Sequence, residues 1–579
     1  MKKQKLIIGI LIFVSFLIFV KQSDKAFHWL KSDEIRKPVV FSDGTGYYAY
    51  LPQVFIYQDK GFTFIDSLTK NYPNFTFNHC LTRTENYDYY DKYFIGTALC
   101  MSPFFLTAHG ITKITGGKLD GYSYFYQLFI ALSTFCFWFI GCFFLFKTLR
   151  LFEVSILVSV VSLALMTFVT NLNYYIVYEP SLSHIYSFAV IAVWLFCVKK
   201  YVYTKQQKYF IWTCALLGLI ILIRPVNGIV LVLFPFFFTT FSNFKNWLLL
   251  FLKNEKSTLV IGLGIILALI LVQYLNVYLQ LGKLSFGAYD GETFEFLWSP
   301  KIFEVLFSYR KGLFVYTPFI VLTILGFFPL FKRDRFLFLG MVIFTFLFTY
   351  ITASWWCWYY GGSLGMRPYV DVYAVFILLL AFLLSNLNRL TFVIFSLVSI
   401  VLFYYNGMLL YQYDHAIIHY SEMNEARFKK VFLKTDRRFE WETYVQEPKN
   451  HFPNWNKIGV LINQSFTLGE NGEKRIGTWA TDSLFSRQAI VVKFKAKISE
   501  DASPTISLYG IKDGVHQNLD GRMYGWSLIE INKEYPVEFY FPTTKYFHKM
   551  DSVYFLFSGQ AGVTSIKDLS IAKYREKKN

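Results

Sequence analysis

The stretch YSYFYQLFIALSTFCFWFIGCFFLF, residues 122–146, decides the class of fold of this chain. It contains no acidic or basic side chain, and it is long enough to cross the roughly 30 Å hydrocarbon core of a bilayer as one helix. Lys147 and Arg150 follow it directly, and basic residues next to an apolar run mark the cytoplasmic end of a membrane helix. The stretch therefore predicts a transmembrane helix with its C-terminal end in the cytoplasm.

Similar apolar runs recur up to about residue 412 and predict a polytopic α-helical membrane protein of about eleven spans. The composition agrees, because 54% of the residues are hydrophobic and only 17% are charged. With a cytoplasmic N-terminus, nearly all basic residues of the short loops lie on the cytoplasmic side, so the net charge of +18 is explained without a nucleic-acid partner. The predicted spans are residues 5–22, 122–146, 152–170, 184–198, 209–223, 226–241, 257–279, 313–331, 336–352, 369–386 and 390–411.

The chain is expected to have three parts. Residues 1–412 form the membrane domain, whose first outer loop, residues 23–121, is long and contains a re-entrant or interfacial helix at 93–111. Residues 413–458 predict a polar, helical connector. Residues 459–579 alternate between polar and apolar positions and are interrupted by turn residues, which predicts a jelly-roll-like antiparallel β-sandwich. This last domain could bind a carbohydrate or serve as a passive cap, and the sequence leaves both open.

One carboxylate stands out in the first outer loop. Asp43 begins the segment DGTGYYAYLP, and the tyrosine-rich sequence behind it is typical of a helix in the membrane interface. Asp43 is either a helix cap in an interfacial turn or a catalytic carboxylate held at the bilayer surface.

Other outer loops contribute cations. Arg367 follows GGSLGM, whose glycines permit close approach of a ligand, and its guanidinium fork suits a phosphate. Its structural alternative is an ion pair with Asp371, one helical turn further on. Arg310 and Lys311 form a second cationic pair, which either binds phosphate or anchors the next span at the interface.

Further polar residues complete the predicted outer face. Glu179 and His184 form a proton relay or are simply polar loop residues, and Asp91 is a further acceptor or relay candidate. Arg224 lies between two apolar runs, and its charge there requires an ion pair or solvation. The cysteines contain no CxxC pair, so the sequence indicates no metal site. We expect no cofactor, although the sequence leaves a divalent metal open.

Seven segments in this order resemble the landmarks of bacterial multi-pass glycosyltransferases of the GT-C class, which are related to the protein O-mannosyltransferases and lipid A aminoarabinose transferase. The resemblance covers roughly residues 1–412. The segments are DGTGYYAYLP, KYFIGTALCMSPFFLTAHG, DGYSYFYQ, EPSLSHIYSF, LIRPVNG, SYRKGLFVYTP and WWCWYYGGSLGMRPYVD.

The resemblance implies an enzyme of the bacterial inner membrane that uses a polyprenyl-phosphate-linked sugar on the periplasmic face. It implies that Asp43 is the catalytic aspartate and that Arg367 is the basic residue near the donor phosphate. Metal-using members carry an adjacent acidic pair, whereas Gly44 follows Asp43 here. We therefore predict inverting glycosyl transfer to a hydroxyl of a lipid, glycan or protein acceptor. The alternatives are a flippase or transporter of a lipid-linked sugar and a polysaccharide ligase or polymerase with a diphosphate-linked donor.

Overall fold

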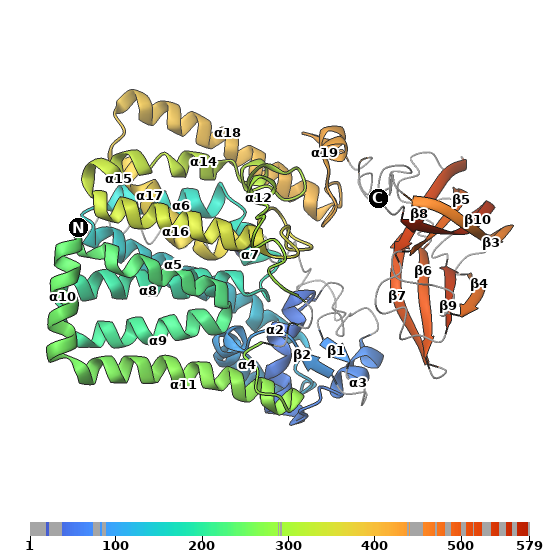
Figure 1. Cartoon of the computed structure of the whole chain (residues 1–579), viewed down its shortest axis with the longest axis horizontal. Coiled ribbons are helices and arrows are strands. Elements are labelled where there is room, and N and C mark those ends of the chain that lie inside the picture. Colours follow the sequence, from blue (N-terminus) through green and yellow to red (C-terminus); the bar gives the residue numbers. More distant parts are fainter. Residues whose placement is uncertain are drawn as a thin grey trace. The chain divides into compact units, whose positions relative to one another are not determined.

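A computed structural model divides the chain into two compact units, residues 1–410 and residues 411–579 (Figure 1). We call them the helical unit and the C-terminal unit and describe each by itself. The structure describes residues 19–21, 38–72, 81–83, 89–287, 289, 292–436, 439, 455–468, 472–480, 488–498, 505–512, 515–523, 534–542, 552–558 and 564–576. All but residues 19–21 of the predicted first span lies outside this set.

The first part of the helical unit consists of short elements. They are α2 (Asp43–Pro52), a π-helical turn η1 (Gln53–Tyr57), α3 (Phe64–Asn71), the paired strands β1 (Leu81–Arg83) and β2 (Tyr89–Asp91), and α4 (Gly96–Ile114). Every residue of α2 after Asp43 is buried, so this helix is packed within the unit. The segment predicted as a re-entrant or interfacial helix at 93–111 corresponds to α4, one continuous helix.

Longer apolar helices build the rest of the helical unit. In the part of the chain that the structure describes, six helices are long and apolar enough to cross a membrane, or seven spans if one bent pair counts as a single span. The six are α5 (Tyr124–Leu151), α8 (His184–Thr204), α11 (Lys256–Leu281), α16 (Arg335–Ser354), α17 (Pro368–Ser385) and α18 (Arg389–Asp414). The remaining helices are α6 (Ile156–Phe168), α7 (Leu172–Val177), α9 (Gln207–Ile223), the 3-10 helix η3 (Pro225–Phe238), α10 (Phe241–Asn254) and α12 (Ile302–Phe307).

Four predicted spans differ from the structure. The runs 152–170 and 209–223 correspond to α6 and α9, which have 13 and 17 residues and are shorter than the six helices above. The run 313–331 is not one helix but three short ones, α13 (Leu313–Tyr316), α14 (Phe319–Ile324) and α15 (Phe327–Arg333). Pro318 lacks the N–H that a continuous helix needs, and Gly326 lies directly against the backbone of Leu379. The run 226–241 is the 3-10 helix η3, which is followed by α10 at an angle of 105°.

Helix α17 is the centre of the helical unit, and it positions the candidate site. Its residues from Pro368 to Leu384 are all buried, and it packs against α8, α6 and α14. Helices α8 and α17 begin at the end of the unit where α9 and α16 stop. His184, Arg224 and Arg367 therefore lie at the same end of the helical unit.

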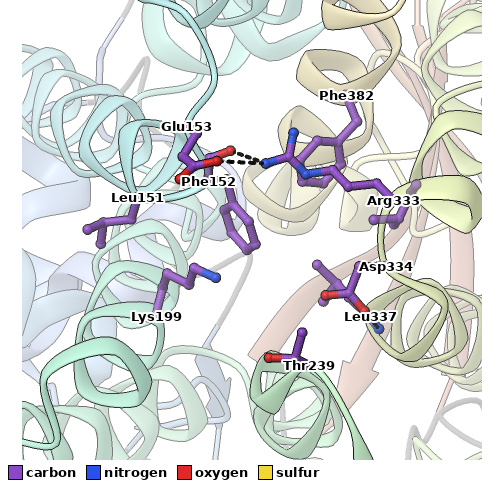
Figure 2. A pocket seen from close by; sticks show the side chains of 10 residues that line it. Leu151, Phe152, Glu153, Lys199, Thr239, Arg333, Asp334, Leu337 and Phe382 are labelled. Atoms are coloured by element: carbon purple, nitrogen blue, oxygen red, sulfur yellow. Dashed lines mark hydrogen bonds and ion pairs between the residues drawn. The ribbon is translucent and has the colours of Figure 1, made fainter.

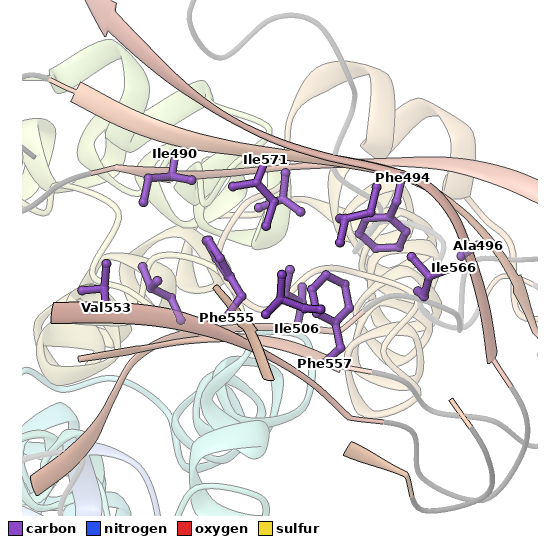
Figure 3. Packing of buried hydrophobic residues seen from close by; sticks show 13 residues of the cluster. Ile490, Phe494, Ala496, Ile506, Val553, Phe555, Phe557, Ile566 and Ile571 are labelled. Atoms are coloured by element: carbon purple, nitrogen blue, oxygen red, sulfur yellow. The ribbon is translucent and has the colours of Figure 1, made fainter. Parts of the chain in front are cut away.

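The C-terminal unit is a sandwich of two antiparallel four-stranded sheets, in the orders β3-β10-β5-β8 and β4-β9-β6-β7. Alternate residues of both sheets point into a shared core, which includes Ile490, Phe494, Phe555 and Ile571 (Figure 3). The strands are β3 (Trp455–Leu468), β4 (Glu473–Ala480), β5 (Gln488–Ile498), β6 (Thr505–Lys512), β7 (Val515–Met523), β8 (Glu534–Pro542), β9 (Ser552–Ser558) and β10 (Thr564–Glu576). The alternating pattern of residues 459–579 thus corresponds to β-sheet structure.

The connector is helical only in part. Helix α18 extends to Asp414, and the short helix α19 (Glu425–Val431) follows a non-helical stretch. Gln412 donates hydrogen bonds to the carbonyls of Val431 and Lys434, which fold the connector back on itself. Residues 440–454 of the predicted connector lie outside the described residues.

Candidate active site

Asp43 lies at the start of α2, directly after a residue with an unusual backbone conformation. Ser42 has φ 54° and ψ −138°, and its side chain caps no backbone group of the helix. Such a conformation costs a non-glycine residue on the order of 1–3 kcal/mol and is concentrated at functional sites. The interpretation of Asp43 as a helix cap is wrong, because Ser42 occupies the cap position and no side chain caps the helix there. The Asp43 carboxylate instead forms an ion pair with a distant arginine.

Two glycines allow the beginning of α2 to pack closely against neighbouring segments. A Cβ atom at Gly44 would lie 1.9 Å from the Ser181 Oγ, and one at Gly46 would lie 2.4 Å from the Tyr93 ring. Ser181 is itself fixed, because its hydroxyl donates to the carbonyl of Val39. These contacts hold Asp43 against the segment that carries Glu179.

Arg367 is positioned by the loop between α16 and α17. Gly361 and Gly365 have φ values of 64° and 70°, which favour glycine, and Tyr360 has φ 55°. Asn171 and Tyr175 both donate hydrogen bonds to the carbonyl of Leu364, at 2.8 and 3.3 Å. The loop is thereby fastened to the segment that begins α7, and Arg367 lies where α17 begins.

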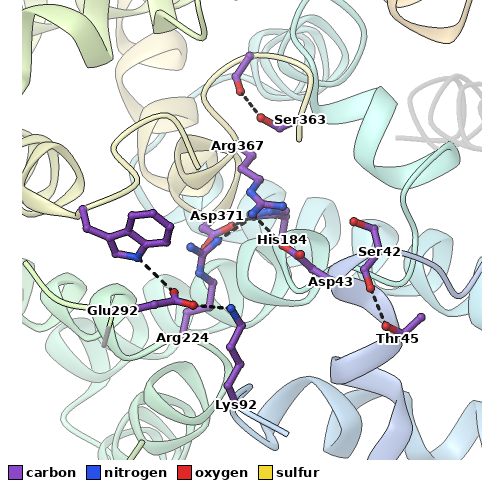
Figure 4. Close-up of polar contacts among 12 residues, drawn as sticks. Ser42, Asp43, Thr45, Lys92, His184, Arg224, Glu292, Ser363, Arg367 and Asp371 are labelled. Atoms are coloured by element: carbon purple, nitrogen blue, oxygen red, sulfur yellow. Dashed lines mark hydrogen bonds and ion pairs between the residues drawn. The ribbon is translucent and has the colours of Figure 1, made fainter. Parts of the chain in front are cut away.

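Asp43 and Arg367 form the central contact of the site. The Asp43 Oδ2 lies 2.7 Å from an Arg367 Nη, and the two side chains are 21% and 14% exposed (Figure 4). Burial opposes ionisation of Asp43, but Arg367, a hydrogen bond from Tyr93 and the charge of Lys92 together hold its pKa below the usual value. Asp43 is therefore an ionised carboxylate, and the Nε of Arg367 is a buried donor without a hydrogen-bond partner among the described residues.

A second buried cluster lies next to this pair. Asp371 accepts a hydrogen bond from Asn227 at 2.8 Å, and its carboxylate lies 2.6 Å from His184 Nδ1 and 3.4 Å from Arg224. The alternative that Arg367 pairs with Asp371 is therefore wrong, because Asp371 is occupied by three other side chains. The prediction that Arg224 needs an ion pair is confirmed.

Glu179 and Lys311 lie deeper, near the same pair. Burial raises the pKa of Glu179 to about 7, although Arg367 and a hydrogen bond from Tyr174 oppose the shift. Its Oε2 atom is buried and has no hydrogen-bond partner in the part of the chain that the structure describes. Lys311 is 1% exposed and donates to the carbonyl of Ser363. Burial lowers the pKa of Lys311 well below its usual value, so it is a poorer phosphate ligand than Arg367.

The remaining predicted residues lie around the site in different roles. Arg310 stacks on Tyr359, with its guanidinium carbon 3.3 Å from the ring centroid. Asp91 is 1% exposed, and burial raises its pKa well above the usual value. His184 contacts Asp371 and not Glu179, so the structure does not bring the predicted Glu179 and His184 relay together.

Asn227 and Lys92 were not predicted from the sequence, and Asp371 was named there only as a structural partner of Arg367. Asn227 and Asp371 form the buried cluster, and Lys92 forms an ion pair with Glu292 at 2.5 Å beside the site (Figure 4). Asn227 lies three residues after Arg224 in an apolar run. A polar residue in such a run is the one sequence feature that could have predicted its place in the site. Lys92 carries no local signal of this kind.

Similarity searches add no family assignment. Among the described residues, no three His, Cys, Asp or Glu side chains are grouped so that they could hold a metal ion. No protein-family model matches the chain, and neither the curated proteins nor the solved structures that we searched contain a match.

The raised pKa of Glu179 predicts how stability depends on pH. Below about pH 4.5 the folded and unfolded chains both hold this proton, and between pH 4.5 and 7 only the folded chain does. The resulting contribution, on the order of 3 kcal/mol, is therefore lost as the pH rises through 7. We expect the melting temperature of the purified protein to fall from pH 5 to pH 8, and to fall less in Glu179→Gln. The exposed Glu295→Gln is the control, and equal pH dependence in both variants would contradict the assignment.

The packing of Gly44 predicts a local loss of stability. A methyl group at this position would overlap Ser181, so Gly44→Ala should lower the free energy of unfolding by about 1–3 kcal/mol. Gly110→Ala is a matched control in α4, because no atom lies within 4 Å of the added Cβ. Chemical or thermal unfolding in detergent measures both. Equal stabilities of the two variants would show that α2 does not pack as described.

Proposed function

We propose that this protein transfers a sugar from a polyprenyl-phosphate-linked donor to an acceptor hydroxyl with inversion at the anomeric carbon. The observation that carries the proposal is the contact of Asp43 with Arg367 at one end of the helical unit. The resemblance of the surrounding segments to GT-C glycosyltransferases supports the same chemistry. The proposed setting is the outer face of a bacterial inner membrane, where a lipid-linked donor reaches the site from the bilayer.

Arg367 is the proposed ligand of the donor phosphate. Its guanidinium can form two parallel hydrogen bonds to phosphate oxygens, which a lysine cannot do. The side chain is 14% exposed and lies beside Asp43, directly after the α16–α17 loop that Asn171 fastens. A cation fixed before the reaction stabilises the negative charge that develops as the polyprenyl phosphate departs.

Asp43 is the proposed general base. Its low pKa depends on Arg367, and burial acts in the opposite direction. When the donor phosphate binds the guanidinium of Arg367, Asp43 loses part of the interaction that lowers its pKa. Burial then raises the pKa of Asp43, and its carboxylate becomes a stronger base. Donor binding would thus activate the base, so that an acceptor hydroxyl is deprotonated only when a donor is present.

The proposed step is a single displacement. The acceptor O–H gives its proton to Asp43 while its oxygen forms a bond to the anomeric carbon. The bond between that carbon and the phosphate oxygen breaks, and the polyprenyl phosphate leaves with the bonding electrons. Glu179, with a pKa of about 7, is suited to accept the proton from Asp43 afterwards and release it to solvent.

The proposal is tested with purified full-length protein in detergent. A lipid extract from a strain that lacks the gene supplies the accumulated donor and any lipid acceptor. We expect the protein to convert a polyprenyl-phosphate sugar to polyprenyl phosphate, as measured by mass spectrometry. A flippase would leave the donor intact, since detergent provides no second compartment. Consumption of a diphosphate-linked glycan would instead favour the ligase or polymerase.

A further inference from the structure

A cavity of about 260 Å³ lies among the helix ends on the other side of the helical unit (Figure 2). Its wall is made by the end of α5, by α8, by the turn between α15 and α16, and by α17. The lining residues used below are Leu151, Phe152, Glu153, Lys199, Arg333, Asp334 and Phe382.

The cavity is separate from the candidate active site. Lys199 lies fifteen residues after His184 on α8, which corresponds to about 22 Å along a helix. Phe382 has the same separation from Arg367 along α17. The two sites therefore lie toward opposite ends of these helices.

Two cations face the cavity. The ammonium of Lys199 lies 3.9 Å from the centroid of the Phe152 ring, and within the described part of the chain no hydrogen bond or ion pair of this ammonium is found. An Nη of Arg333 donates to the carbonyl of Phe152 at 2.5 Å, which fixes the guanidinium at the cavity wall. Figure 2 shows the Lys199 ammonium beside the Phe152 ring and the Arg333 guanidinium directed at Glu153 and the Phe152 carbonyl.

The nearby carboxylates neutralise these cations only weakly. Glu153 is 91% exposed, and its carboxylate lies 4.0 Å from Arg333. Asp334 caps α16, because its Oδ1 accepts a hydrogen bond from the N–H of Leu337. The surrounding helix ends carry further basic residues, namely Lys147, Arg150, Lys200, Lys205, Lys332 and Arg335. The cavity wall thus carries two cations and two carboxylates, and the excess of basic side chains around it makes it a site for an anion.

We propose that this cavity binds the phosphodiester headgroup of a phospholipid from the leaflet at the basic end of the helical unit. The phosphate would lie between Lys199 and Arg333, where charge-assisted hydrogen bonds are available. The apolar side chains of Leu151 and Phe382 line the same cavity and suit the glycerol and the first carbons of the lipid. The basic helix ends would attract the anionic lipids of that leaflet.

Native mass spectrometry of the full-length protein in detergent tests the phosphate. We expect phosphatidylglycerol to bind more tightly than diacylglycerol, which lacks the phosphate. Lys199→Gln should weaken the binding of phosphatidylglycerol about fivefold, the effect of one surface-exposed charge, whereas Lys199→Arg should retain it. Lys208→Gln is the matched control, because this exposed lysine begins α9 at the same end and does not line the cavity.

Two results would overturn the proposal. One is equal binding of phosphatidylglycerol by Lys199→Gln and by the unchanged protein. The other is equal stabilisation of the protein by inorganic phosphate and by phosphatidylglycerol at the same concentration. We expect inorganic phosphate to raise the melting temperature less than phosphatidylglycerol does. Equal stabilisation would assign the cavity to a soluble anion and not to a lipid.

Discussion

Arg367→Ala is expected to lower the turnover of glycosyl transfer about 30- to 1000-fold, which corresponds to about 2 to 4 kcal/mol of transition-state stabilisation. The proposed contact strengthens as negative charge collects on the departing phosphate, so the loss should appear in kcat and not only in donor affinity. Arg367→Lys keeps the charge but removes the bidentate geometry, and it should recover only part of the rate. Steady-state release of polyprenyl phosphate measures both variants.

A folding defect must be separated from this effect. Arg367→Ala leaves the buried carboxylate of Asp43 without its counterion, which is itself destabilising. The melting temperature and the elution volume of each variant therefore accompany the kinetics, and Arg335→Ala at the other end of the helical unit is the control. Normal turnover by well-folded Arg367→Ala would remove Arg367 from the reaction and leave Arg310 as the more accessible cation.

Asp43→Asn should lower kcat about 10²- to 10⁴-fold, because an amide of the same shape cannot accept the proton of the acceptor hydroxyl. Donor affinity should remain or increase, since the amide no longer competes with the donor phosphate for the charge of Arg367. A lower kcat with an unchanged or lower KM for the donor distinguishes a base from a residue that only supports the fold. Initial rates over a range of donor concentrations give both constants.

A control for Asp43→Asn is available in the same part of the chain. Asp66 accepts a hydrogen bond from Tyr89 at 2.7 Å, outside the candidate site. Asp66→Asn should leave kcat unchanged. Near-normal kcat in Asp43→Asn would contradict the assignment of the base, and Glu179→Gln would then be the next variant to measure.

The membrane helices were predictable because each one contains a long apolar run with few charged residues. Helices α5, α8, α11, α16, α17 and α18 agree with predicted spans to within a few residues at most ends. The prediction of a single span at 313–331 was wrong because hydropathy alone does not show where a helix is interrupted. Pro318 interrupts the backbone hydrogen bonds, and the effect of Gly326 depends on Leu379, which is distant in sequence.

The site was predictable only as separate residues. Asp43 and Arg367 carry local signals, but their contact depends on the packing of α2 against the loop before α17. The nearby Asp371 was a reasonable partner for Arg367 at helical spacing. However, Arg367 is the N-cap residue of α17, just before its first helical residue, Pro368. Asp371 lies inside the helix and is held by His184 and Asn227.

The central claim is that Asp43 and Arg367 act as one unit in the reaction. A double-mutant cycle tests it, with kcat measured for Asp43→Asn, Arg367→Ala and the combined variant. If the pair works as proposed, the combined variant should be slower than the slower single variant by no more than about twofold, since either change disables the unit. Losses that multiply in the combined variant would show that the two residues act independently and would contradict the account.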